Sequence, residues 1–188
     1  WAEDNTSAFE LTLVAQATIS GTSKTIDLKG NDVLSEQDNA LHRINLLKGR
    51  LPTEGQSPTE GILDEGSADL EGYKIGDTIS IEFEGEQHTI EIVGIARELS
   101  RSIYMHREDV QPIVGQDANG ALLVTKEGVD IEDIRFSTIS IVEKETMVAT
   151  FEELIEQQKA MMQSIYVLGA LMAIAILFNT LLINLSER

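Results

Sequence analysis

The sequence predicts an α+β fold: a domain of mixed strands and short helices, followed by a long stalk helix that is continuous with one transmembrane helix. Three observations support this. Short alternating segments and short helical segments follow one another in irregular order, with a strong hairpin among them. No glycine or proline occurs from Thr146 to Leu168. No charged residue lies between Lys159 and Glu187.

Composition limits the classes of function. The 188 residues include 32 Asp and Glu against 14 Lys and Arg, a formal net charge of -18. A chain this acidic repels phosphates, so we expect no nucleic-acid partner. The 42% of hydrophobic residues are enough for a core and argue against disorder. The absence of cysteine excludes disulfides, thiolate metal sites and cysteine nucleophiles.

The first part of the domain is predicted to hold a strand, a helix and a loop. Residues 9–19 alternate well enough for a strand. Residues 31–48 predict a loop and then a helix, because Ser35 and Asp38 resemble a capping box. Apolar residues of that helix are spaced for one buried face: Leu41, Ile44 and Leu47. The turn-rich residues 51–61 predict a surface loop.

The clearest local signal is a hairpin. Residues 78–84 alternate between apolar and polar, Gly85 turns the chain, and residues 88–96 return. One face of this hairpin is therefore expected to be buried and the other wet. Gly94, inside the second strand, predicts a β-bulge.

Shorter elements complete the predicted domain. The apolar pair Ile62 and Leu63 precedes a helical turn at 67–70. The remaining pattern predicts strands at 102–105, 121–125 and 139–142, and helical segments at 108–114 and 131–136.

A long helix is predicted from Met147. Its apolar residues recur at spacings of three, four and seven, which places them on one stripe of the stalk: Met147, Phe151, Leu154, Ile155 and Met162. Without a helix breaker it can run on for about 40 residues, or about 60 Å. The predicted boundaries are 1–146 for the extracytoplasmic domain, 147–164 for the stalk, 165–185 for the transmembrane helix and 186–188 for the start of a cytoplasmic segment.

The segment Ile165–Leu185 predicts the membrane span. Its 21 uncharged residues match the ~20 that cross hydrocarbon as a helix. A buried core helix is the alternative, but core helices usually keep a polar face. Gly169 and Ala173 are four residues apart, the small-xxx-small spacing that permits close helix contact in lipid. The Asn179 amide is costly against lipid, so it is expected to face another helix.

Charge at the two ends of the long helix predicts its orientation. The stalk carries several glutamates, whereas the far end leaves through Glu187 and Arg188. Cytoplasmic flanks are rich in Lys and Arg, so residues 1–163 are expected to be extracytoplasmic and Arg188 cytoplasmic.

No pattern in the sequence supports catalysis. The three histidines, His42, His88 and His106, have no metal-ligand spacing, and there is no phosphate-binding loop and no nucleophile elbow. Carboxylates are so numerous that an acid–base pair among them has no specificity. We therefore expect no enzymatic activity, no metal and no cofactor.

Four stretches, taken in order, carry a resemblance to a known family. They are Leu47-x-Gly49-Arg50, Ile75–Thr78, Ile92–Ala96 and the inner end Asn179–Arg188. With a long helix entering the membrane, this order resembles the FtsX-like, MacB/LolC/LolE-type ABC transporter permeases. The resemblance spans most of residues 40–188, and residues 1–40 carry no landmark. Other membrane helices of such permeases are absent, so the chain would be one part of a permease.

The resemblance implies a MacB-like periplasmic core domain and a mechanism. A separate cytoplasmic ABC ATPase subunit would hydrolyse ATP, and the permease would transmit its movement through the stalk to the external domain. The substrate would be an exported or extracted lipoprotein, lipid or peptide. The implied partners are that ATPase, a second permease subunit in a homo- or heterodimer, membrane lipid, and an extracytoplasmic protein or lipoprotein.

Other readings stay open at this point. One is the cell-division branch of the same superfamily, an FtsX-type regulator of peptidoglycan hydrolases. Another is a single-span, membrane-anchored receptor or adhesion ectodomain, which needs no ATPase. A membrane-tethered hydrolase is a third, although the sequence offers no constellation of residues for it.

Overall fold

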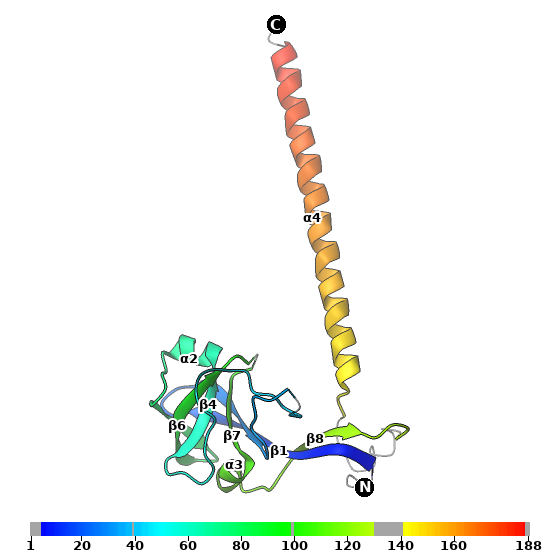
Figure 1. Ribbon diagram of the computed structural model, residues 1–188. Coiled ribbons are helices and arrows are strands. Elements are labelled where there is room, and N and C mark those ends of the chain that lie inside the picture. Colours follow the sequence, from blue (N-terminus) through cyan, green and yellow to red (C-terminus); the bar gives the residue numbers. More distant parts are fainter. Residues whose placement is uncertain (1–4, 39, 99, 130–140, 187–188) are drawn as a thin grey trace. The chain divides into compact units, whose positions relative to one another are not determined.

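The computed structural model describes residues 5–38, 40–98, 100–129 and 141–186 (Figure 1). The chain divides into two compact units, Trp1–Val129 and Asp130–Arg188, each described here by itself. The elements of the first unit are β1 (Thr6–Ile19), β2 (Thr25–Asn31), β3 (Leu46–Gly49), β4 (Thr59–Asp64), α2 (Glu65–Glu71), β5 (Thr78–Phe83), β6 (Glu86–Ala96), β7 (Ser102–His106), α3 (Arg107–Val114) and β8 (Gly120–Thr125). The second unit contains α4 (Lys144–Ser186).

Six strands of the first unit form a closed ring. The hydrogen-bonded order is β2-β7-β4-β6-β5-β1, and β1 pairs with β2 again to close it. The pairs β2–β7 and β4–β6 are parallel, and the other pairs around the ring are antiparallel. The α+β class predicted from the sequence is therefore confirmed. Two strands lie outside the ring, because β3 pairs with β6 and β8 with β1.

The predicted hairpin is confirmed as β5 and β6. Ile79 lies opposite Ile90, and both side chains are fully buried, as is Ile81, whereas the alternate residues Ser80 and Glu82 of β5 are exposed. The predicted bulge is also present. Gly61 of β4 pairs with Ile92, whereas Ile62 pairs with Gly94, so Val93 is the extra residue on β6.

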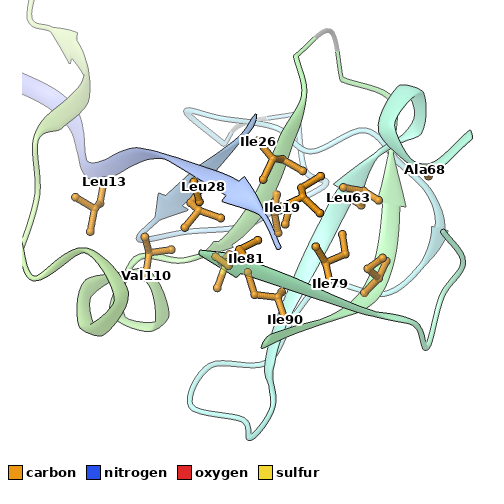
Figure 2. Close-up of a cluster of buried hydrophobic side chains, with 14 residues drawn as sticks. Leu13, Ile19, Ile26, Leu28, Leu63, Ala68, Ile79, Ile81, Ile90 and Val110 are labelled. Carbon is orange, nitrogen blue, oxygen red and sulfur yellow. The ribbon is translucent and has the colours of Figure 1, made fainter. Parts of the chain in front are cut away.

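The core of the unit lies inside the ring (Figure 2). Every strand of the ring contributes to it, and the fully or almost fully buried side chains include Leu13, Leu28, Leu63, Ile79, Ile90 and Ile103. Helices α2 and α3 add Ala68 and Val110 to the same cluster. Burial of one such Leu or Ile side chain contributes ~1.5–3 kcal/mol, so this cluster accounts for much of the stability of the domain.

The helix predicted within residues 31–48 is wrong. The described residues of this segment form no helix, and its end is the short strand β3. The Ser35 hydroxyl accepts a hydrogen bond from the Gln37 amide at 3.1 Å, which closes a turn instead of capping a helix. A second buried cluster explains why the segment is apolar, since Leu34 and Ile44 cover Ile62 and Tyr104 on the outer face of the ring.

The remaining short elements mostly agree with the predictions. Helices α2 and α3 and strands β7 and β8 lie where helical turns and strands were expected. The predicted loop 51–61 is too long, because β4 begins at Thr59, and β2 was not predicted. The helix expected at 131–136 lies outside the described residues, as do Ile139 and Ser140 of the last expected strand. Ile141 and Val142 are described and lie in no strand.

The second unit confirms the long helix. Helix α4 has 43 residues and runs from Lys144 to Ser186 without interruption. It begins three residues before the predicted start at Met147, and it passes the predicted boundary at 164 and 165 as one continuous helix.

Candidate functional site

Helix α4 is long and apolar enough to cross a membrane. The qualifying stretch, Thr146–Ile183, has 38 residues with a mean hydropathy of 2.3 in its most apolar window, and none of that window is buried in the structure. The alternative of a buried core helix is therefore not what the structure describes. Leaving a large aliphatic side chain of this helix in water, and not in an apolar environment, costs ~1.5–3 kcal/mol of free energy. This favours hydrocarbon as the surroundings of its C-terminal half.

The predicted stripe and the predicted small-residue pair share one face of α4. Ile155, Met162 and Gly169 follow one another at intervals of seven residues, close to two helical turns. Ala173 lies eleven residues, close to three turns, beyond Met162. All of these side chains are exposed along the helix, together with Met147, Phe151 and Leu154. One apolar face thus continues from the stalk into the span.

Several hydroxyl groups of α4 are satisfied within the helix. Thr150 donates to the Thr146 carbonyl at 2.8 Å, Ser164 to the Ala160 carbonyl at 3.0 Å and Thr180 to the Ile176 carbonyl at 2.8 Å. Asn179 is exposed, and among the described residues of α4 no group forms a hydrogen bond with its side-chain amide. The predicted exit residues Glu187 and Arg188 lie outside the described residues.

Three of the four sequence landmarks meet at one place in the first unit. Gly49 of β3 is paired with Gly94 of β6, and the Arg50 amide donates to the Val93 carbonyl at 3.0 Å. The third landmark joins them, because the Gly76 amide donates to the Ile92 carbonyl at 2.8 Å. These stretches are 14 or more positions apart in the sequence, so their convergence is a property of the fold.

Close backbone approach explains the two glycines. A Cβ atom on Gly49 would lie 2.2 Å from the Val93 carbonyl oxygen, and one on Gly94 would lie 2.6 Å from the Arg50 carbonyl oxygen. Gly49 also has φ of +88°, in the left-handed region that disfavours side chains. The landmark residues therefore fix how β3 packs against β6.

Arg50 anchors the same region to β4. Its guanidinium donates two hydrogen bonds of 2.6 Å to the Glu60 carboxylate, which also accepts from the Thr53 amide at 2.8 Å. The hydrogen bond from Arg50 lowers the pKa of Glu60, although burial acts in the opposite direction. The same bond raises the pKa of Arg50. This ion pair ties the loop after β3 to the ring.

Strand β1 changes partner in its middle, and sequence reasoning missed the residues gathered there. Thr6–Thr12 pair with β8, whereas Thr12–Thr18 pair with β2. We name the pair formed by Thr6–Thr12 and β8 the ribbon; Figure 1 shows β8 alongside this part of β1. Arg107, at the start of α3, bonds to both Asp32 and Asp117 beside this switch. No sequence signal links these residues, which lie up to 85 positions apart.

The histidines do not form a site. His42 stacks on Tyr104, with ring centroids 5.5 Å apart, and His106 contacts the Pro52 carbonyl at 3.1 Å. His88 lies on β6, away from both contacts. Within the described ranges, no group of three or more His, Asp and Glu side chains is arranged to hold a metal ion.

Comparison with known proteins finds similarity in fold. No protein-family model and no curated protein sequence matches the chain. Among solved structures, the chain is similar to the periplasmic region of MacB from Actinobacillus actinomycetemcomitans, with 15% sequence identity and a TM-score of 0.47 over 71% of this chain. It is also similar to the extracellular domain of the noncanonic ABC-type transporter YknZ from Gram-positive bacteria, with 16% identity and a TM-score of 0.49 over 71% of this chain. The matches cover 64% of the MacB region and 71% of the YknZ domain.

Proposed function

We propose that the chain is the external domain, the stalk and one membrane helix of an ABC transporter permease of the FtsX-like, MacB/LolC/LolE type. A separate cytoplasmic ATPase hydrolyses ATP, and this subunit passes the resulting movement to the external domain. The substrate class is a lipoprotein, lipid or peptide that is exported or extracted from the membrane. The chain itself carries no nucleotide chemistry.

The continuity of α4 is the observation that supports this proposal most. Force is transmitted along a helix only while its backbone hydrogen bonds are unbroken, and α4 is one helix of 43 residues across stalk and span. A tether needs no such continuity. The order of the four sequence landmarks supports the same function, and the two similar solved structures are described as regions of MacB and of an ABC-type transporter.

The shared face of α4 supports a helix partner in the permease. One face of α4 carries Phe151 and Leu154 on the stalk and Gly169 in the span. The face is apolar on the stalk, and in the span its small residue lets another helix come close. A second permease helix is the partner that fits both halves, because an apolar stalk face above the bilayer needs a protein surface to cover it. Asn179 would then pair with a polar group of a neighbouring helix.

Cysteine labelling tests the proposed arrangement. The chain has no cysteine, so single cysteines can be introduced at Ser7, which is exposed on β1, and at Ser186, the last residue of α4. In spheroplasts containing the full permease, a membrane-impermeant maleimide should label Ser7→Cys without treatment and Ser186→Cys only after permeabilisation. Labelling of Ser186→Cys in intact spheroplasts would contradict the proposed topology.

A further inference from the structure

The ribbon is the part of the first unit with a potential hinge. Strand β1 crosses from the ribbon to the ring at Thr12, and there it exchanges β8 for β2 as its partner. The buried side also changes, since Glu10 is buried on the ribbon and Leu13 in the ring. A strand that changes partner and buried face at one point can bend there unless other contacts prevent it.

Contacts on the β2 side hold one edge of β1 at this point. The Asp32 carboxylate accepts from the Leu11 amide at 3.0 Å, and the Glu10 carboxylate accepts from the Val33 amide at 2.9 Å. Side chains thus replace the ladder hydrogen bonds that β2 no longer supplies beyond Asn31.

Contacts on the β8 side hold the other edge. The Asn119 side-chain amide accepts from the Val14 amide at 2.9 Å and donates to the Val14 carbonyl at 2.6 Å. The Asn119 backbone amide also donates to the Thr12 carbonyl at 3.1 Å. One asparagine therefore extends the ladder of β8 past the point of partner exchange.

A single guanidinium joins these two edges. Arg107 bonds through Nε to the Asp32 carboxylate on the β2 side. Through Nη1 it donates to the Asp117 carbonyl at 3.0 Å and to the Asp117 carboxylate at 2.6 Å on the β8 side. Its side chain is only 13% exposed. Arg107 is itself fixed, because α3 packs so closely on β2 that a Cβ atom on Gly30 would lie 2.9 Å from the Arg107 Cα.

We infer that Arg107 is a positioning residue that locks the ribbon to the ring, so that the two move as one body. Strand β8 is the last strand before α4 among the described residues, so a displacement passed along the chain from α4 reaches the ribbon before the other strands. With Arg107 in place, the displacement reaches β2 and α3 as well as β1. The lock itself is independent of the proposed function, whereas its use in transport rests on it.

The charge of Arg107 suits a permanent lock. The hydrogen bond that Arg107 donates to Asp32 raises the pKa of the guanidinium, against the effect of burial, so Arg107 stays charged wherever the protein is folded. A planar guanidinium also bonds to two carboxylates in fixed directions, which a lysine ammonium does not. The lock should therefore be lost with lysine as well as with alanine.

Distance measurement between two spin labels tests the lock. Labels are attached to the full chain in detergent at Ala121→Cys, exposed on the ribbon, and at Glu82→Cys, exposed on β5 of the ring. The protein with Arg107 unchanged should give a single, narrow distribution of label-to-label distances. Arg107→Ala and Arg107→Lys should lose it and give a broad distribution. A distribution as narrow in Arg107→Ala as in the Arg107-containing protein would overturn the inference.

Two further variants separate the lock from general stability. Asp117→Ala removes the Asp117 carboxylate, on a side chain that is 73% exposed, and leaves the β8 arm only the bond to the Asp117 carbonyl, so it should fold normally and still broaden the distance. Arg97→Ala removes an exposed ion pair with Glu65 and should leave the distance narrow. A narrow distance in Asp117→Ala would overturn the inference even if Arg107→Ala fails to fold. These measurements need no ATPase, so they are separate from the labelling test of the proposed function.

Discussion

Glu60 shows how a single carboxylate links the loop after β3 to the ring. It is 7% exposed, yet it is fully paired, by two bonds from Arg50 and one from the Thr53 amide. A buried carboxylate with this set of donors is stabilised in its charged form. The sign of its pKa shift follows, and with it a dependence of stability on pH.

We expect Glu60→Gln to destabilise the domain by about 1–3 kcal/mol at pH 7, because charge-assisted hydrogen bonds are lost. The folded pKa of Glu60 lies below the unfolded one, so its stabilisation is present above the ordinary carboxyl range and is lost as the pH falls through the folded pKa. The difference in free energy of unfolding between Glu60→Gln and the unchanged protein, measured with denaturant, should therefore disappear below about pH 4. Glu65→Gln, which affects an exposed pair, is the control and should change little. If this difference in unfolding free energy persists unchanged at low pH, the charged Glu60 carboxylate is not the source of the stabilisation.

Gly49 and Gly85 form a matched pair of glycines. Both have φ of +88°, but a Cβ atom on Gly49 would meet the Val93 carbonyl oxygen at 2.2 Å, while Gly85 has open space. Gly85→Ala should cost only the conformational strain, about 1–3 kcal/mol. Gly49→Ala should cost clearly more, since β3 must also move away from β6. Equal unfolding midpoints for the two variants would show that the close packing of β3 is not important.

At the scale of elements, the stalk gives the sharpest functional prediction. Gln157 is exposed on α4, off the apolar face. Proline there removes one backbone hydrogen bond and costs about 3 kcal/mol or more in a helix interior. In the full permease we expect Gln157→Pro to be expressed and to support ATP hydrolysis by the partner ATPase while transport is lost. Gln157→Ala keeps the helix and should transport normally.

The opposite result would identify α4 as a tether. If Gln157→Pro still transports at the normal rate, continuous hydrogen bonding through the stalk is not needed. The anchored-ectodomain function would then account better for the same helix.

Asn179 tests the contact of the span with a neighbouring helix. Replacement by leucine removes an amide that is costly in lipid, so Asn179→Leu should insert at least as well as the unchanged protein. If the amide pairs across helices, assembly or transport should fall, by the equivalent of about 1–2 kcal/mol in helix association. Replacement of its neighbour, Thr180→Val, is a control, because the Thr180 hydroxyl is satisfied by the Ile176 carbonyl. Normal assembly and transport by Asn179→Leu would place the amide outside any helix contact.

Individual elements differ in how far the sequence could predict them. The β5–β6 hairpin was predictable because its two strands are adjacent in the chain and alternate cleanly. Helix α4 was predictable because nothing interrupts it. The segment 31–48 was misread because Leu41, Ile44 and Leu47 have helical spacing by coincidence. Ile44 belongs to the buried cluster that covers the outer face of β4 and β7, whereas Leu41 and Leu47 are half-buried outside that cluster.

The contacts at the point where β1 changes partner could not be predicted from the sequence either, because they join residues that are far apart in the chain. Arg107 meets Asp32 because α3 packs on β2, and their positions are 75 residues apart. Neither residue belongs to a local motif, so a single sequence gives no reason to pair them. Strand β2 was missed because its alternation is short: Ile26 and Leu28 are apolar, but Gly30 stands at the next position of that face.

At the scale of the whole molecule, we expect the two units to differ in whether they need detergent to stay in solution. The first unit has its own core and ends at Val129, whereas the uncharged span Ile165–Leu185 belongs to the second. A chain ending at Lys159 should be folded and soluble in water, while the full chain should require detergent. Gel filtration with and without detergent measures this. A full chain that remains monomeric without detergent would show that α4 is not a membrane helix.

The position of β8 in the chain has a consequence for synthesis. Thr6–Thr12 emerge from the ribosome before their partner strand, which ends only at Thr125. Ring strands β2 and β5 do not pair with β1 before Thr12, so that part of β1 waits for more than a hundred residues of translation. During that time an apolar strand edge that includes Phe9 is open to pairing with another nascent chain. The late synthesis of β8 therefore leaves this part of β1 open to mispairing until translation has passed Thr125.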